Sequence, residues 1–150
     1  MQERNGVTRR DVLRLPQAIR ITDVVVPYDP KWPAHFETER FALDAILSPW
    51  LVAGVHHIGS TAIPNMPAKP ILDMMAGVSS PSCTQQAEHT LGRVGYRLSP
   101  HRVDAALFVR TDAACADTHH VRLTVPASDL WRERLTFRDA LRRDPQLVEA

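Results

Sequence analysis

The sequence predicts an α+β fold, in which helices cover a mixed β-sheet, and three observations favour this class. The apolar patterns run in the order strand, helix, strand, strand, helix, three strands, helix. The three late strands follow one another with no helix between them, whereas a doubly wound parallel sheet needs more crossover helices. The chain has 150 residues, which is about the size of one domain. We therefore expect one domain built on a single mixed sheet.

The first half of the chain supplies three predicted strands and two helices. Asp23 to Tyr28 is a short β-branched run that contains Pro27, and a strand with a proline is tolerated at the edge of a sheet. A helix is predicted from Asp29 to about Leu47, because apolar residues recur at helical spacing and prolines stand only near its start. The remaining elements of this half are strands from Trp50 to Ile58 and from Pro70 to Val78, then a helix from Ser82 to Val94.

The second half is predicted to form a run of strands closed by one helix. Alternating apolar and polar residues predict the strands Tyr96 to Leu98, Ala105 to Arg110 and His119 to Val125, and the last two are expected to pair as a hairpin. Ser128 is a typical helix-capping residue, so a final helix is predicted from Asp129 to about Arg143.

Composition and charge argue against several classes of protein. The 18 basic and 17 acidic residues nearly cancel, so the net charge gives no case for binding nucleic acid or a membrane surface. No apolar run approaches the roughly 18 residues that indicate a membrane span. The two cysteines form no CxxC motif and no disulfide framework, which favours a reducing, cytoplasmic location. The sequence does not predict the oligomeric state.

Residues 1–22 differ from the rest of the chain because they are polar and rich in arginine. No apolar segment follows the charged start, so this region does not have the pattern of a secretory signal. We expect an N-terminal extension, mobile or loosely docked, before a domain that spans residues 23–150.

The stretch His56–Met75, HHIGSTAIPNMPAKPILDMM, contains polar residues that a buried strand does not need. Gly59, Ser60 and Thr61 directly follow a predicted strand. A glycine there lets the backbone approach a ligand, and successive N–H groups and hydroxyls can hold a phosphate, although such a tripeptide is most often only a turn. Asp73 lies inside an apolar run and requires a partner. A metal ion satisfies this requirement, and so does an arginine or a cluster of backbone N–H groups.

Four segments of the chain form one ordered pattern: VPYDPKWPAHFETE (Val26–Glu39), HHIGSTAIPNMPAKPILDMMAGV (His56–Val78), THH (Thr118–His120) and LTFRDALRRDP (Leu135–Pro145). This pattern resembles the GrpB family, a set of small proteins with the fold of the polymerase-beta-like nucleotidyltransferases. The resemblance covers about residues 23–148 and implies a nucleotidyltransferase-like fold.

The resemblance also implies roles for residues of the polar stretch. In the superfamily a Gly-Ser turn after a strand holds nucleotide phosphates, and carboxylates on the next strand bind divalent metal. Gly59 and Ser60 would therefore hold phosphate, Thr61 would add a hydroxyl contact, and Asp73 would be the catalytic carboxylate that binds Mg²⁺. Lys69, one of two lysines in the chain, would offset phosphate charge, unless it is an exposed loop residue. The implied activity is transfer of a nucleotidyl group from a nucleoside triphosphate to a small acceptor.

The sequence departs from the superfamily pattern at the expected carboxylates. Met75 stands where active nucleotidyltransferases usually carry a second carboxylate. Arg122 stands where the family commonly has a histidine, and its guanidinium suits a phosphate better than a metal. The alternative function is therefore a non-catalytic nucleotide- or phosphate-binding domain, or an interaction domain. A further carboxylate would have to come from Asp104, Asp117 or Asp129.

Three more side chains are candidates for the same site: His57, His120 and Arg138. His57 ends a predicted strand and is either a structural or a site histidine. Arg138 lies on an otherwise apolar stripe of the final helix, where it needs an acidic or phosphate partner or must reach water. We expect that partner in the cleft across which Ser60 and Asp73 face one another.

Overall fold

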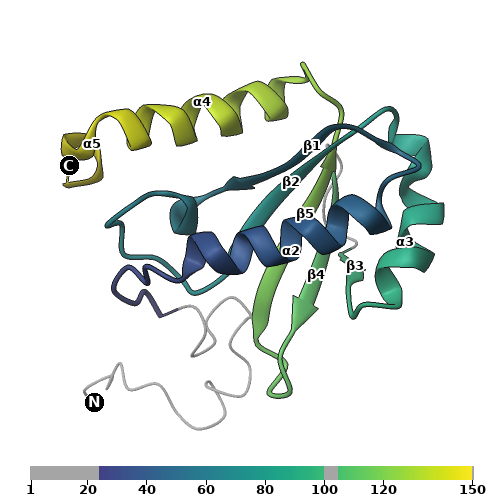
Figure 1. Cartoon of the computed structure of the whole chain (residues 1–150), viewed down its shortest axis with the longest axis horizontal. Helices are drawn as coiled ribbons and strands as arrows, with labels where there is room; N and C mark the ends of the chain where they lie inside the picture. The colour runs from purple at the N-terminus through teal and green to yellow at the C-terminus, as the bar shows by residue number, and fades with distance from the viewer. Residues whose placement is uncertain (1–23, 100–104, 150) are drawn as a thin grey trace, which may run out of the picture.

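A five-stranded sheet forms the centre of the computed structural model, which describes residues 24–99 and 105–149 (Figure 1). The strand order is β1-β2-β5-β4-β3. β2 and β5 are parallel and the other neighbours are antiparallel, so the predicted mixed sheet is confirmed. The extension predicted at residues 1–22 lies outside the described residues. The strands are β1 (Leu51–Ile58), β2 (Leu72–Val78), β3 (Arg97–Ser99), β4 (Ala106–Thr111) and β5 (Asp117–Thr124).

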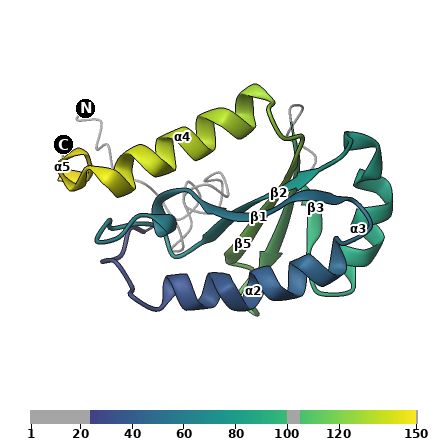
Figure 2. The ribbon, with the colours of Figure 1, turned by 45° about the horizontal axis from the view of Figure 1, so that its top comes forward.

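Helices lie on both faces of this sheet. Figure 2 shows α2 and α3 on one face and α4 on the other. The helices are α2 (Trp32–Ile46), α3 (Thr84–Gly92), α4 (Asp129–Arg143) and α5 (Pro145–Glu149), and the 3₁₀ turns are η3 (Ser60–Ala62) and η4 (Pro81–Cys83). Within the described ranges, no helix has both the length and the apolar character needed to cross a lipid bilayer.

The alternation of side chains along β2 separates the main core from the candidate site. Leu72, Met74, Ala76 and Val78 are buried in one cluster with residues of α2 and α3. Successive side chains of a strand point to opposite faces of the sheet. Asp73 therefore points to the face on which α4 lies, away from the main core.

The prediction of a strand from Asp23 to Tyr28 is wrong for residues 24–28, which are the part of this range that the structure describes. Only an isolated bridge forms, in which Val26 and Ala68 exchange backbone hydrogen bonds of 2.9 and 3.0 Å. Pro27 and Pro67 stand beside the two bridge residues, and proline has no N–H to donate. The pairing therefore does not extend into a strand.

The final helix has the bounds that the sequence predicts. The Ser128 hydroxyl accepts a hydrogen bond from the backbone N–H of Trp131 at 3.3 Å, which satisfies one of the unpaired donors at the helix start. The short helix α5 was not predicted from the sequence. It begins at Pro145, a first helical position where proline is tolerated because no N–H is needed there.

Candidate functional site

A pocket of about 390 Å³ lies where three neighbouring strands end or begin, and it brings together most of the predicted site residues. β1 ends at Ile58 beside the start of β2, and β5 starts at the same edge because it is parallel to β2. We call this cavity the Asp73 pocket. Its polar lining residues are Ser60, Thr61, Lys69, Asp73, Asp117 and His120.

The turn after β1 approaches Asp73 closely because residue 59 is a glycine. Gly59 has a φ of +72°, a backbone conformation that other residues rarely adopt. A Cβ atom added to Gly59 would lie 2.9 Å from Oδ2 of Asp73. Both the conformation and the contact therefore require glycine, and they place Ser60 at the rim of the pocket that Asp73 lines.

Replacing Gly59 by alanine is expected to lower the free energy of unfolding by about 2–3 kcal/mol, because a residue forced into such a backbone region costs about 1–3 kcal/mol before the contact with Asp73 is counted. Urea unfolding measures this change. Gly92→Ala is the matched control, since a Cβ at that position of α3 meets nothing within 4 Å and alanine favours a helix. Equal losses in the two variants would contradict the role assigned to Gly59.

Asp73 is paired with an arginine. Nη1 of Arg122 donates a hydrogen bond to Oδ1 of Asp73, and the two side chains are 8% and 20% exposed. The sequence left open whether the partner of Asp73 is a metal ion or a group of the protein such as an arginine. In the structure an arginine, Arg122, is a partner. A metal ion at this oxygen would have to displace a buried guanidinium.

The described residues do not fit a magnesium ion that the protein holds by itself. Across residues 24–99 and 105–149, no three histidine, cysteine or carboxylate side chains are grouped so that they could hold a metal ion. Mg²⁺ prefers carboxylate oxygens together with the phosphates of a substrate. Mg²⁺ therefore stays a prediction that depends on phosphate oxygens supplied by a ligand.

A second carboxylate does reach the Asp73 pocket, from the start of β5. Asp117 lines the pocket, and its Oδ2 lies 3.0 Å from Nε2 of His120. Asp129, another candidate, has a side chain that is 89% exposed and pairs with Arg132. Asp104, the third candidate, lies outside the described residues. The pocket thus contains two carboxylates, each of which already has a cationic or histidine partner.

Thr61 fixes the turn through its hydroxyl. This hydroxyl donates to the carbonyl of Ile71 at 3.0 Å, and it lies 2.9 Å from Nε2 of His57. Since the hydroxyl proton goes to Ile71, Nε2 of His57 must be the donor in the second bond. The Thr61 hydroxyl therefore already has two partners within the protein, and its predicted contact with a ligand stays a prediction.

His57 lies on the opposite side of β1 from the Asp73 pocket. Its ring is buried and stacks on Phe36 of α2, with ring centroids 4.8 Å apart. Burial, together with the positive charges of Arg142 and Arg138, lowers the pKa of His57 to about 4. His57 is therefore a neutral residue that positions the turn through Thr61.

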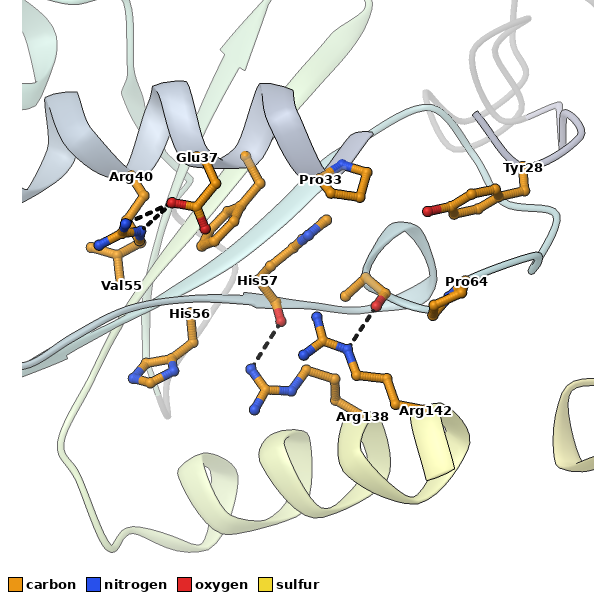
Figure 3. A pocket seen from close by; sticks show the side chains of 12 residues that line it. Tyr28, Pro33, Glu37, Arg40, Val55, His56, His57, Pro64, Arg138 and Arg142 are labelled. Carbon is orange, nitrogen blue, oxygen red and sulfur yellow. Dashed lines mark hydrogen bonds and ion pairs between the residues drawn. The ribbon is translucent and has the colours of Figure 1, made fainter. Parts of the chain in front are cut away.

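Arg138 also lies away from the Asp73 pocket. It lines a second cavity, of about 400 Å³, between α2, β1 and α4, which we call the α2–α4 pocket (Figure 3). Its guanidinium pairs with Asp139 at 2.9 Å and donates to the carbonyl of His57 at 3.3 Å. Arg138 thus has an acidic partner, but the prediction that it shares a cleft with Asp73 is wrong.

A charged network that sequence reasoning missed connects α2 to the far strands. Glu39 accepts hydrogen bonds from the hydroxyl of Tyr96 at 2.6 Å and from both terminal nitrogens of Arg110 at 2.9 and 3.0 Å. Arg110 also lies 2.9 Å from Nε2 of His119. We call these four residues the Glu39 network. Two of the four motif segments in the sequence touch this network, because Val26–Glu39 ends at Glu39 and Thr118–His120 contains His119.

Burial and hydrogen bonding set the charges in the Glu39 network. Burial raises the pKa of Glu39, but hydrogen bonds from Tyr96 and Arg110 outweigh this effect and the pKa lies below its ordinary value. Burial and the charge of Arg110 lower the pKa of His119 to about 4. The network therefore consists of an ionised Glu39, a charged Arg110 and a neutral His119, and it stabilises the packing of α2 on the sheet.

The five-stranded mixed sheet with helices on both faces has a nucleotidyltransferase-like fold. The structure of Cid1 in complex with the UTP analog UMPNPP superposes with a TM-score of 0.53 over 85% of this chain and 40% of Cid1. The sequences are 16% identical, so this likeness concerns the fold alone.

The family is identified by sequence. Residues 23–150 match the family model described as GrpB protein, and the chain belongs to the GrpB family. The UPF0157 protein YqkA of Bacillus subtilis (strain 168) is 33% identical over 125 residues, which are 83% of this chain and 36% of YqkA. The chain thus spans about a third of the length of that relative. The crystal structure of GrpB from Enterococcus faecalis is 29% identical, with a TM-score of 0.76 over 84% of this chain and 76% of that one.

Proposed function

We propose that the Asp73 pocket binds a nucleotide or a related phosphate compound. The observation that carries this proposal is that Ser60, Lys69 and Asp73 line one cavity of about 390 Å³ at the strand ends of a nucleotidyltransferase-like fold. Small-molecule sites are typically cavities of about 300–1,000 Å³ with a few convergent polar groups. Cid1, which shares this fold, forms a complex with a UTP analog, and that ligand is of the class proposed here.

The charges of the pocket are compatible with an anionic ligand. An unpaired Asp73 carboxylate would repel a phosphate, but Arg122 balances that charge. Lys69 adds a positive charge at the exposed rim of the pocket. The Lys69 ammonium group can form strong charge-assisted hydrogen bonds with a phosphate, whereas the buried Arg122 guanidinium does not line the pocket.

Nucleotidyl transfer to a small acceptor is the second candidate function. It is favoured by the presence of two carboxylates, Asp73 and Asp117, in the same pocket. Metal-dependent transfer relies on positioning and on charge stabilisation by metal ions. Since both carboxylates are already paired, we propose that Mg²⁺ strengthens binding only modestly and that any transfer is slow.

Lys69→Gln is expected to weaken the binding of nucleoside triphosphates by about tenfold or more, because a hydrogen bond to a charged group contributes about 1.5–3 kcal/mol. Calorimetric titration with and without Mg²⁺ measures the affinity. Lys31→Gln is the matched control, because Lys31 is the other lysine, is exposed and lies outside the pocket.

Two other results, one from this titration and one from a pyrophosphate-release assay, would overturn the proposal in different ways. If the wild type binds no nucleoside triphosphate with or without Mg²⁺, the domain belongs to the interaction class. If pyrophosphate is released rapidly in the presence of an acceptor, the protein is an active transferase and the paired carboxylates do not limit it.

A further inference from the structure

The α2–α4 pocket contains two arginines whose guanidinium groups reach the same short segment. Arg138 and Arg142 are one helical turn apart on α4, so their side chains lie on the same face of the helix. Arg138 donates to the carbonyl of His57 at 3.3 Å, and Nε of Arg142 donates to the carbonyl of Ala62 at 2.9 Å (Figure 3). Two like charges are therefore held together at the edge of β1.

Only one of the three arginines that line this pocket lacks an acidic partner in the described part of the chain. Arg40 pairs with Glu37 at 2.6 Å, and Arg138 pairs with Asp139 at 2.9 Å. Arg142 contacts the Ala62 carbonyl, and no carboxylate of the described residues lies within ion-pair distance of it. Burial and the charge of Arg138 lower the pKa of Arg142. The charge of Asp139 acts on Arg142 in the opposite direction, so Arg138 and Arg142 share one carboxylate and together have one positive charge in excess.

The remaining walls of the pocket are largely apolar. Tyr28, Pro33 and Val55 line the pocket, and the buried ring of Phe36 stacks on the neutral ring of His57. In Figure 3 the Tyr28 ring extends toward the space between Pro33 and Arg142. A cavity of about 400 Å³ with apolar walls and a few placed polar groups is typical of a site for a small organic molecule.

We propose that the α2–α4 pocket binds a small organic monocarboxylate, whose carboxylate pairs with Arg142 and whose apolar body packs beside Phe36 and Tyr28. The one excess positive charge of Arg138 and Arg142 matches a single negative charge, and the planar fork of a guanidinium matches the two oxygens of a carboxylate. No residue lines both this pocket and the Asp73 pocket. The monocarboxylate site is therefore separate from the proposed nucleotide site.

Sodium benzoate is a suitable probe, and the NMR signals of the His57 ring report its binding because this ring lines the pocket. We expect saturable shifts with a Kd of about 1 mM, and Arg142→Gln should weaken binding by about tenfold, which corresponds to about 1.4 kcal/mol. Arg142→Lys should retain part of the affinity. Benzamide, which has the same shape without the charge, should produce no saturable shift.

Arg143→Gln is the matched control variant, because Arg143 is exposed on the same helix and does not line the pocket. Its affinity for benzoate should equal that of the wild type. Unchanged binding in Arg142→Gln, equal binding of benzamide and benzoate, or no saturable His57 shift would each overturn the proposal. The NMR signals of residues far from α4 should be the same in Arg142→Gln as in the wild type, which verifies that the variant is folded.

Discussion

Replacing Glu39 by alanine is expected to lower the free energy of unfolding by about 3–5 kcal/mol, because it leaves a half-buried guanidinium and a buried hydroxyl without their acceptor. The Glu39 side chain is 13% exposed and that of Arg110 is 26% exposed. The hydroxyl of Tyr96, a residue that is 1% exposed, would also lose its bond of 2.6 Å. Urea unfolding of the variant at neutral pH measures the loss.

Glu37→Ala is the matched control for this experiment. Glu37 lies on the same helix and also pairs with an arginine, but its side chain is 57% exposed. Exposed ion pairs contribute about 0–1 kcal/mol. Equal destabilisation by the two substitutions would show that the Glu39 network adds no more stability than a surface ion pair.

The elements that the sequence predicted well are those whose signals are local. Ser128 and the apolar spacing after it define a helix start within one turn, and α4 begins where this pattern predicts. The apolar run that includes Leu72 and Met74 is fully buried on both sides of Asp73 in β2. Its shortness was enough to distinguish a strand from a helix.

The parts that the sequence did not predict depend on partners that are distant in the chain. Glu39 and Arg110 are 71 residues apart, and no local pattern connects them. The spacing of apolar residues along α4 correctly predicted that Arg138 requires a partner. The same spacing does not determine on which side of β1 the Arg138 side chain lies. Val26 is a β-branched residue in a run that is typical of a strand. It forms only an isolated bridge with Ala68, because Pro27 follows Val26 and Pro67 precedes Ala68.

The partner of Asp73 in the candidate site is also distant in the chain, and the sequence did not identify it. The sequence required a partner for Asp73 and identified Arg122 as a residue suited to phosphate. Only the parallel register of β2 and β5, which places Met75 opposite Arg122, brings the guanidinium to the carboxylate two residues earlier. The register results from the packing of the whole sheet.

Acidification from pH 7 to pH 4 is expected to lower the free energy of unfolding by up to about 6 kcal/mol, which is about 3 kcal/mol for each of two histidines, the buried His57 and the half-buried His119. His57 and His119 have pKa values lowered from 6.5 to about 4 in the folded protein, mainly by burial. Between these values the unfolded chain binds protons that the folded protein does not bind. Stability is therefore complete above pH 6.5 and falls as the pH drops toward 4.

Urea unfolding at a series of pH values between 7 and 4 measures this slope. His119→Gln should remove about half of the slope, because the neutral amide cannot take up the proton that the unfolded histidine binds. His89→Gln is the matched control: His89 is exposed on α3, and its loss should leave the slope of the wild type. A slope that is the same in all three proteins would contradict the role assigned to His119. Glu39 does not supply this slope, because its lowered pKa makes its contribution disappear only at still lower pH.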